Sequence, residues 1–212
     1  MKAPDIDYLA ASEDFIPEKA TWRRICSLIF KELRPDKKDW LGIVFPIVGG
    51  IILAWIIGSA VDTVQMTDTI CAVFLEIHVA VFGCILAAYS ILLAFLDDKY
   101  IKKLLRINYE GNANYLKAGT EYFEAAMYIY VVGILLSLGV KLIVMCMPDD
   151  FVLTRNDLLN ESLAAVFLCV YFVYAIRATY EIKSVVANTA TLFGGSLAFR
   201  IQAFASDLDE EN

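Results

Sequence analysis

Four long apolar runs dominate the hydrophobic pattern of the chain, at residues 41–61, 69–96, 122–147 and 158–176. An α-helix rises about 1.5 Å per residue, so about 20 apolar residues cross a bilayer. Backbone groups in lipid must find hydrogen bonds within their own segment, which favours helices over open strands. The pattern therefore predicts an all-α, polytopic membrane protein with four transmembrane helices, in a domain of residues 41–176. The second run exceeds one crossing, so we expect it to tilt or protrude.

A polar segment, residues 1–40, precedes the first run and contains an amphipathic stretch, "WRRICSLIFKEL". Trp22 and Ile29 fall on one face of this stretch, whereas Arg23 and Arg24 lie off that face. A basic amphipathic helix beside a span is typical of a membrane-surface segment, and packing on the end of the helix bundle is the equal alternative. In either place it can serve as a plug or tether. No short apolar run with a cleavage site precedes it, so we expect no cleavable signal peptide.

Two further polar segments are a basic loop, residues 97–121, and a C-terminal segment, residues 177–212. Within the loop, "NYEGNANY" is too rich in Asn and Gly to stay helical, so we expect a turn. The C-terminal segment should continue as a helix, break at Gly194 and Gly195, and end in an acidic tail.

Positive charge is divided unevenly between the two sides of the predicted bundle. Nearly all of the 18 lysine and arginine residues lie in the three polar segments, whereas the loop after the first run holds Asp62 and Asp68 and no base. Cytoplasmic loops carry the excess of basic residues. We therefore expect a multi-pass protein of the cell inner membrane with both termini in the cytoplasm.

Composition supports the membrane class and argues against several soluble functions. Apolar and aromatic residues make up 59% of the chain and mean hydropathy is +0.60, whereas soluble domains are closer to half apolar. The sequence holds no glycine-rich phosphate loop and no hydrolase or zinc-protease motif, and its five cysteines and one histidine lack metal-ligand spacing. We expect no enzyme activity, no cofactor and no metal site.

Among the ionisable residues within the runs, Glu76, His78 and Lys141 lie away from the cytoplasmic interface, where charge is costly unless it faces protein or water. Glu76 and Lys141 each lie about 10 Å from the outer end of their run, so they should meet at matching depth. One interpretation is an ion pair that locks the two helices together. The other is that Glu76 lines or gates an ion path in an oligomer. Lys141 can also extend its ammonium group to the outer surface, which would weaken both interpretations.

Small residues accompany both charges. Steps of three or four residues from Glu76 pass a row of small residues in the second run: Ala80, Gly83, Ala87, Ser90 and Ala94. The same steps back from Lys141 pass a row in the third run: Ser137, Gly133 and Ala126. Such rows let helices approach closely and leave room for a narrow water path. The candidate pore or gate residues are therefore Glu76, His78, Gly83, Ser137 and Lys141.

His78 and Glu76 cannot share a face, because two residues turn an α-helix by about 200°. His78 should instead face the same side as Phe82 and Ile85, hydrogen-bonded to a neighbouring backbone group.

The first run carries a second small-residue pattern, Gly50, Ala54 and Gly58, after a proline at position 46. Spacing of four residues puts these positions on one helix-packing face. Packing within the chain is the favoured interpretation and an oligomer contact is the alternative.

A basic face is predicted in the loop of residues 97–121, formed by Lys99, Lys102, Lys103 and Arg106. Clustered bases bind anionic headgroups, and they also mark plain positive-inside topology. The functional interpretation is a site for an anionic cytoplasmic ligand such as a nucleotide or an oligonucleotide.

The order of these features along the whole chain resembles the small membrane effectors of bacterial anti-phage operons. The amphipathic "WRRICSLIFKEL", four spans with both ends inside, and the basic "DDKYIKKLLR" are most similar to the HalA channel family of the Hailong system. In that family a tetrameric membrane channel is held shut by a single-stranded DNA oligomer made by a partner nucleotidyltransferase. The resemblance implies the class of function only, with a homo-oligomer, perhaps a tetramer, in membrane lipid. Asp97 and Asp98 beside the bases argue against a DNA site there.

We therefore expect an oligomeric, ligand-gated pore that depolarises the bacterial inner membrane and is gated from the cytoplasmic side. A non-conducting anchor or scaffold that recruits a partner through residues 1–40 and 177–212 is the alternative. A small transporter is the third hypothesis, which the lack of inverted repeats or broken helices weakens.

Overall fold

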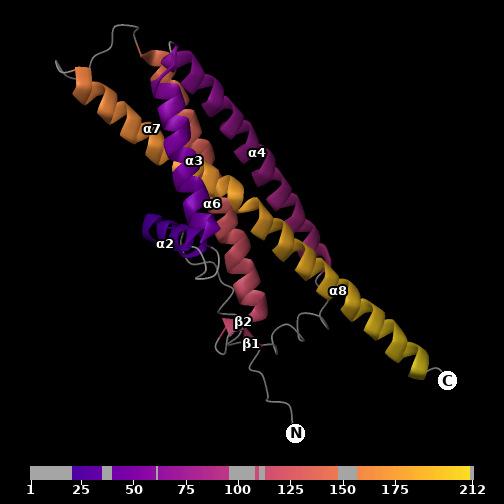
Figure 1. Cartoon of the computed structure of the whole chain (residues 1–212). Coiled ribbons are helices and arrows are strands. Elements are labelled where there is room, and N and C mark those ends of the chain that lie inside the picture. The colour runs from indigo at the N-terminus through magenta and orange to yellow at the C-terminus, as the bar shows by residue number, and fades with distance from the viewer. Residues whose placement is uncertain are drawn as a thin grey trace.

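A computed structural model describes residues 21–34, 40–60, 62–95, 108–109, 113–147 and 157–210. The described part consists of long helices and one very short antiparallel hairpin (Figure 1). The helices are α2 (Trp22–Leu33), α3 (Leu41–Gly58), α4 (Thr63–Phe95), α6 (Tyr115–Cys146), α7 (Asp157–Tyr180) and α8 (Ile182–Glu210). The strands are β1 (Asn108–Tyr109) and β2 (Ala113–Asn114).

Four stretches of helix are long and apolar enough to cross a membrane: Leu41–Gly58, Thr63–Ile91, Lys117–Cys146 and Leu159–Ala198. This confirms the prediction of an all-α protein with four candidate spans. The helices that contain the second and third apolar runs, α4 and α6, are longer than those runs. α4 begins at Thr63, where the Thr63 hydroxyl donates to the carbonyls of Ile57 and Ala60 and so stabilises the turn from α3.

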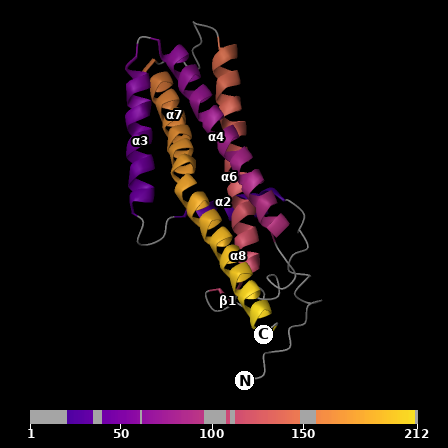
Figure 2. The ribbon, with the colours of Figure 1, turned by 90° about the vertical axis from the view of Figure 1, so that its right-hand side faces the viewer.

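The four helices that are candidate membrane spans form two closely packed pairs, α3 with α7 and α4 with α6 (Figure 2). In the first pair, Gly50 of α3 touches α7: a Cβ at Gly50 would lie 2.5 Å from Cγ2 of Val173. Ala54 is buried one turn further along the same face, whereas Gly58 is exposed. Gly50 and Ala54 therefore pack within the chain, as the favoured interpretation expects. At Gly50 only glycine permits such a close approach of the two backbones.

Tyrosine hydroxyls join the two pairs where α6 meets α7. The bonds are Tyr130 to the carbonyl of Ala178 (2.9 Å), Tyr174 to the carbonyl of Ile129 (2.7 Å), and a hydroxyl–hydroxyl bond between Ser137 and Tyr171 (2.9 Å). A hydrogen bond between helices is favourable in an apolar environment because it leaves no polar group unsatisfied.

α7 and α8 follow nearly one line, and α8 extends past the ends of its neighbours in both views (Figures 1 and 2). The interruption lies at Glu181, whose amide donates to the carbonyls of both Arg177 (3.2 Å) and Ala178 (3.1 Å). The predicted break at Gly194 and Gly195 is wrong, since α8 runs through both. A glycine costs a helix only about 1 kcal/mol relative to alanine, which the flanking helix formers offset.

The predicted turn in "NYEGNANY" is confirmed by the pairing of β1 with β2, in which Asn108 lies opposite Asn114 and Tyr109 opposite Ala113. The candidate basic face lies outside the described residues: Lys99, Lys102, Lys103 and Arg106.

Candidate functional site

Glu76 lies on the outer surface of the described bundle. The small residues that follow it along the helix, from Ala80 through Gly83 and Ala87 to Ser90, are also exposed. A Cβ added at Gly83 would meet nothing within 4 Å. The predicted small-residue row of α4 therefore exists, and within a single chain no other described helix covers it.

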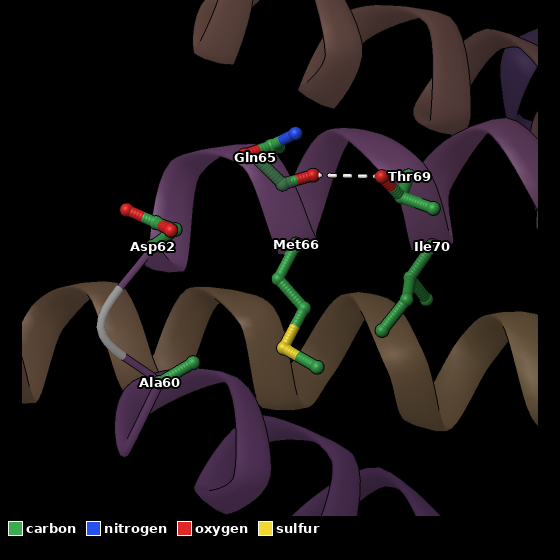
Figure 3. A pocket seen from close by; sticks show the side chains of 6 residues that line it. All are labelled: Ala60, Asp62, Gln65, Met66, Thr69 and Ile70. Atoms are coloured by element: carbon green, nitrogen blue, oxygen red, sulfur yellow. Dashed lines mark hydrogen bonds between the residues drawn. The ribbon is translucent and has the colours of Figure 1, made fainter.

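A shallow hollow of about 470 Å³ lies on α4 near the turn from α3 (Figure 3). Asp62, Gln65 and Thr69 contribute its polar groups, and Met66 and Ile70 contribute apolar walls. The Thr69 hydroxyl donates to the carbonyl of Gln65 (2.9 Å). Asp62, Gln65, Thr69 and Glu76 follow one another at steps of three, four and seven residues, which return to the same side of a helix. The polar residues of the hollow therefore extend the outward row of Glu76.

Lys141 does not pair with Glu76, in contrast to the expected ion pair. Its Nζ atom lies 2.6 Å from Oδ1 of Asp68. α4 begins six residues earlier than its apolar run, so Asp68, and not Glu76, matches the depth of Lys141. Each partner lies about 8 Å from its helix end, whereas Glu76 lies about 20 Å from the start of α4.

His78 is fully buried where α4 meets α6 and α7. Its ring lies between Phe74 and Tyr130, with ring centres 6.3 and 6.0 Å away. A Cβ at Gly133 would lie 2.8 Å from Nδ1, so a glycine is required opposite the imidazole. The backbones of Gly133 and Ala175 lie close to the ring, in line with the prediction of a neighbouring backbone group, but neither ring nitrogen makes a hydrogen bond of good geometry within the described part of the chain.

The five candidate pore residues therefore separate into two groups. Glu76 and Gly83 face outward, while His78 and Ser137 lie inside the bundle. Lys141 is partly exposed, at the end of the bundle where α3 turns into α4. Ile85 is buried on the side of His78, as predicted. The small-residue row of α6 faces inward and gives room to His78.

α2 packs across the bundle rather than standing apart from it. Ile29 is buried against Ile129 and Ala178, so the bundle-packing alternative is what the structure contains. Two ion pairs fix the docking, Arg24 to Glu124 (3.1 Å) and Lys31 to Glu121 (3.1 Å). Trp22 and Arg23 of the candidate surface helix remain exposed.

Sequence reasoning missed a buried ion pair beneath α2. Nη1 of Arg177 lies 2.6 Å from Oε2 of Glu181, and both side chains are nearly inaccessible. Nε of Arg177 also donates to the carbonyl of Leu33 at the end of α2 (3.2 Å). The four-residue spacing of this pair on one helix is the local signal that predicts it, while its burial depends on α2.

Glu32 of α2 lies next to this pair. Burial raises the pKa of the Glu32 carboxyl, and the nearby carboxylates of Glu181 and Glu121 raise it further, while Lys31 acts in the opposite direction. Glu32 therefore holds its proton more tightly than an exposed glutamate does.

Among the described residues, no group of three or more histidine, cysteine or acidic side chains is arranged to hold a metal ion. No family model, curated protein or solved structure matches the chain. Functional inference therefore rests on the geometry of α4 and its neighbours.

Proposed function

We propose that the chain assembles as a homo-oligomeric membrane pore whose water path is lined by the outward row of α4. The observation that carries this proposal is the exposure of Glu76 at membrane depth, on a face of small residues. A carboxylate that faces lipid is costly, so such residues almost always face protein or a water-filled cavity. Copies of the same chain provide that cavity, and small residues leave space at its axis.

The outward row carries acidic charge. Asp62 and Glu76 lie about 21 Å apart along α4, and in a symmetric oligomer each position would form a ring of carboxylates. Rings of acidic side chains favour cations in membrane channels. We therefore expect cation conductance, which would depolarise the membrane of a cell.

Gating is proposed to act through α2. This helix holds α6 by two ion pairs, and α6 packs along α4, so a displacement of α2 would reach the pore-lining helix. The positive-inside pattern favours a cytoplasmic position for α2. An anionic nucleotide or oligonucleotide bound by the basic segment that follows α4 is the proposed ligand, and an anti-phage effector of the inner membrane is the proposed physiological role.

The test is conductance of purified full-length protein in a planar bilayer, with and without single-stranded oligonucleotides. Glu76→Gln should change conductance, whereas Glu161→Gln, at an exposed position on α7, should leave it as in the native protein. Size-exclusion chromatography of each variant controls for assembly. Absence of conductance under every condition, or equal currents from both variants, contradicts the proposal.

A non-conducting scaffold is the second candidate, because α8 extends past the bundle and carries exposed Val186, Leu197 and Ile201. This function predicts that a partner protein is lost from pull-downs when α8 is shortened, while Glu76→Gln has no effect on that binding.

A further inference from the structure

A file of polar side chains runs through the interior of the bundle, on the side of α4 opposite Glu76. It contains, in order from the α3–α4 end, Asp68 with Lys141, Cys71, Ser137 with Tyr171, His78, Tyr130, Arg177 with Glu181, and Glu32. The file draws on α4, α6 and α7, with its last member on α2. None of its interior members belongs to the outward row.

The upper part of the file leads from the Asp68–Lys141 ion pair by way of Cys71 and Tyr171 to Ser137. The Cys71 thiol is fully buried, lies in the electrostatic field of Asp68 and Lys141, and is within hydrogen-bonding reach of the Tyr171 hydroxyl. That hydroxyl in turn shares its 2.9 Å bond with Ser137. Ser137 lies four residues from Lys141 on α6, about 6 Å along the axis.

His78 occupies the middle of the file. The backbones of Gly133 and Ala175 lie beside its ring, and each lies one helical turn beyond Ser137 or Tyr171. Both ring nitrogens are fully buried without a hydrogen-bond partner among the described residues. Burying an unsatisfied imidazole is unfavourable, and an apolar ring would pack there without that cost. Packing alone therefore does not explain a histidine at this position.

The lower part of the file connects His78 with the side of the bundle that α2 covers. The Tyr130 ring lies against the imidazole, and its hydroxyl reaches the carbonyl of Ala178 (2.9 Å) within the field of Glu181. Glu181 is paired with Arg177. Glu32, half-buried on α2, is close enough to Glu181 for the two carboxylates to influence each other, which places a titratable group at the end of the file.

We propose that this file conducts protons through the interior of each subunit, with His78 as the carrier. A neutral imidazole accepts a proton at one ring nitrogen and releases the proton of the other to the next group, so charge and atoms balance when the ring returns to its first tautomer. Hydroxyl groups on either side pass protons in the same way, and the one-turn steps next to His78 require the transient entry of water molecules. The species that enters and leaves is hydronium.

This activity goes beyond the oligomeric pore, because it needs only one subunit and uses the opposite face of α4. Imidazole suits the task, since one ring nitrogen accepts a proton while the other donates one. Among the described residues, Tyr130 from α6 lies against the imidazole, whereas Tyr171 from α7 and Cys71 from α4 lie further along the file.

The experiment uses full-length protein in vesicles that contain a pH-sensitive dye, with a potassium gradient and valinomycin to drive protons inward. The native protein should acidify the lumen at least about tenfold faster than protein-free vesicles. His78→Phe, which keeps a ring of similar volume, should lower this rate, and where the protein carries no potassium flux it should return the rate to that of protein-free vesicles. Glu161→Gln should retain the native rate and serves as the matched control.

Potassium flux is measured in the same vesicles without valinomycin, which separates this proposal from the pore. If the native protein carries protons but no potassium, the pore is overturned and the proton path stands. Native proton flux at the background rate, or a native rate in His78→Phe, overturns the proton path. If His78→Phe elutes as an aggregate, Ser137→Ala combined with Tyr171→Phe interrupts the file one turn away and should lower the proton rate in the same way.

Discussion

Glu76 and His78 lie two residues apart on α4, yet one faces outward and the other is enclosed by α6 and α7. The outward face carries a carboxylate and small residues, and it gains a suitable environment only when another molecule covers it. The inward face carries an imidazole whose surroundings are complete in a single chain but lack a hydrogen-bond partner. Two polar residues in one apolar run therefore point to different functions, one that needs an assembly and one that does not.

Two glycines on these faces provide the largest expected contrast. Gly133→Val places a side chain about where the His78 ring lies, so it should destabilise the fold by about 1–3 kcal/mol. Gly83→Val adds the same side chain on the outward face, where nothing lies within 4 Å, and should change stability by about 0.5 kcal/mol or less.

Thermal unfolding in detergent measures both variants, and helix propensity cancels because the substitution is the same. Native mass spectrometry should then show that Gly83→Val weakens assembly. Equal destabilisation by the two variants would mean that the two faces are not distinct.

A smaller effect is expected where Lys141 meets α4. Asp68→Asn removes the partner of Lys141, and because the two side chains are 32% and 41% exposed, we expect a loss of about 1 kcal/mol or less. Asp62→Asn, on the outward row, should leave unfolding unchanged and alter conductance instead. Chemical unfolding of the two variants side by side gives the comparison, and a larger loss with Asp62→Asn would reverse the assignment.

The smallest effect concerns the pH dependence of α2 docking. The raised pKa of Glu32 means that the docked state of α2 favours the protonated carboxyl. Protonation of Glu32 therefore stabilises docking fully at pH values below the ordinary carboxyl pKa of 4.5. That effect is lost as pH rises through the raised pKa. Amide hydrogen exchange of α2 should therefore be faster at neutral pH in the native chain than in Glu32→Gln, and the two should converge in acid. Identical exchange at both pH values would show that Glu32 does not sense its buried neighbours.

The sequence predicted the spans and the opposition of Glu76 and His78, because apolar length and helical period are local properties. It did not predict which face is buried, since the angle between two residues leaves the helix free to rotate. The partner of Lys141 was missed because depth depends on where α4 begins, and the Thr63 hydroxyl extends that helix beyond its apolar run.

Arg177 and Glu181 lie at the end of the fourth apolar run, where the sequence gives no sign of burial. The burial of this pair arises from α2, a segment far away in sequence, whose Leu33 carbonyl accepts a hydrogen bond from the guanidinium. Contacts of this kind depend on tertiary packing, which composition and periodicity do not specify.

The most direct test of the central claim is the reversal potential of single channels in a potassium chloride gradient. If the outward face of α4 lines the path, the native protein should reverse close to the potassium equilibrium potential. Glu76→Gln should move that value towards zero, while His78→Phe should leave it in place. A reversal potential that Glu76→Gln does not move would contradict the account.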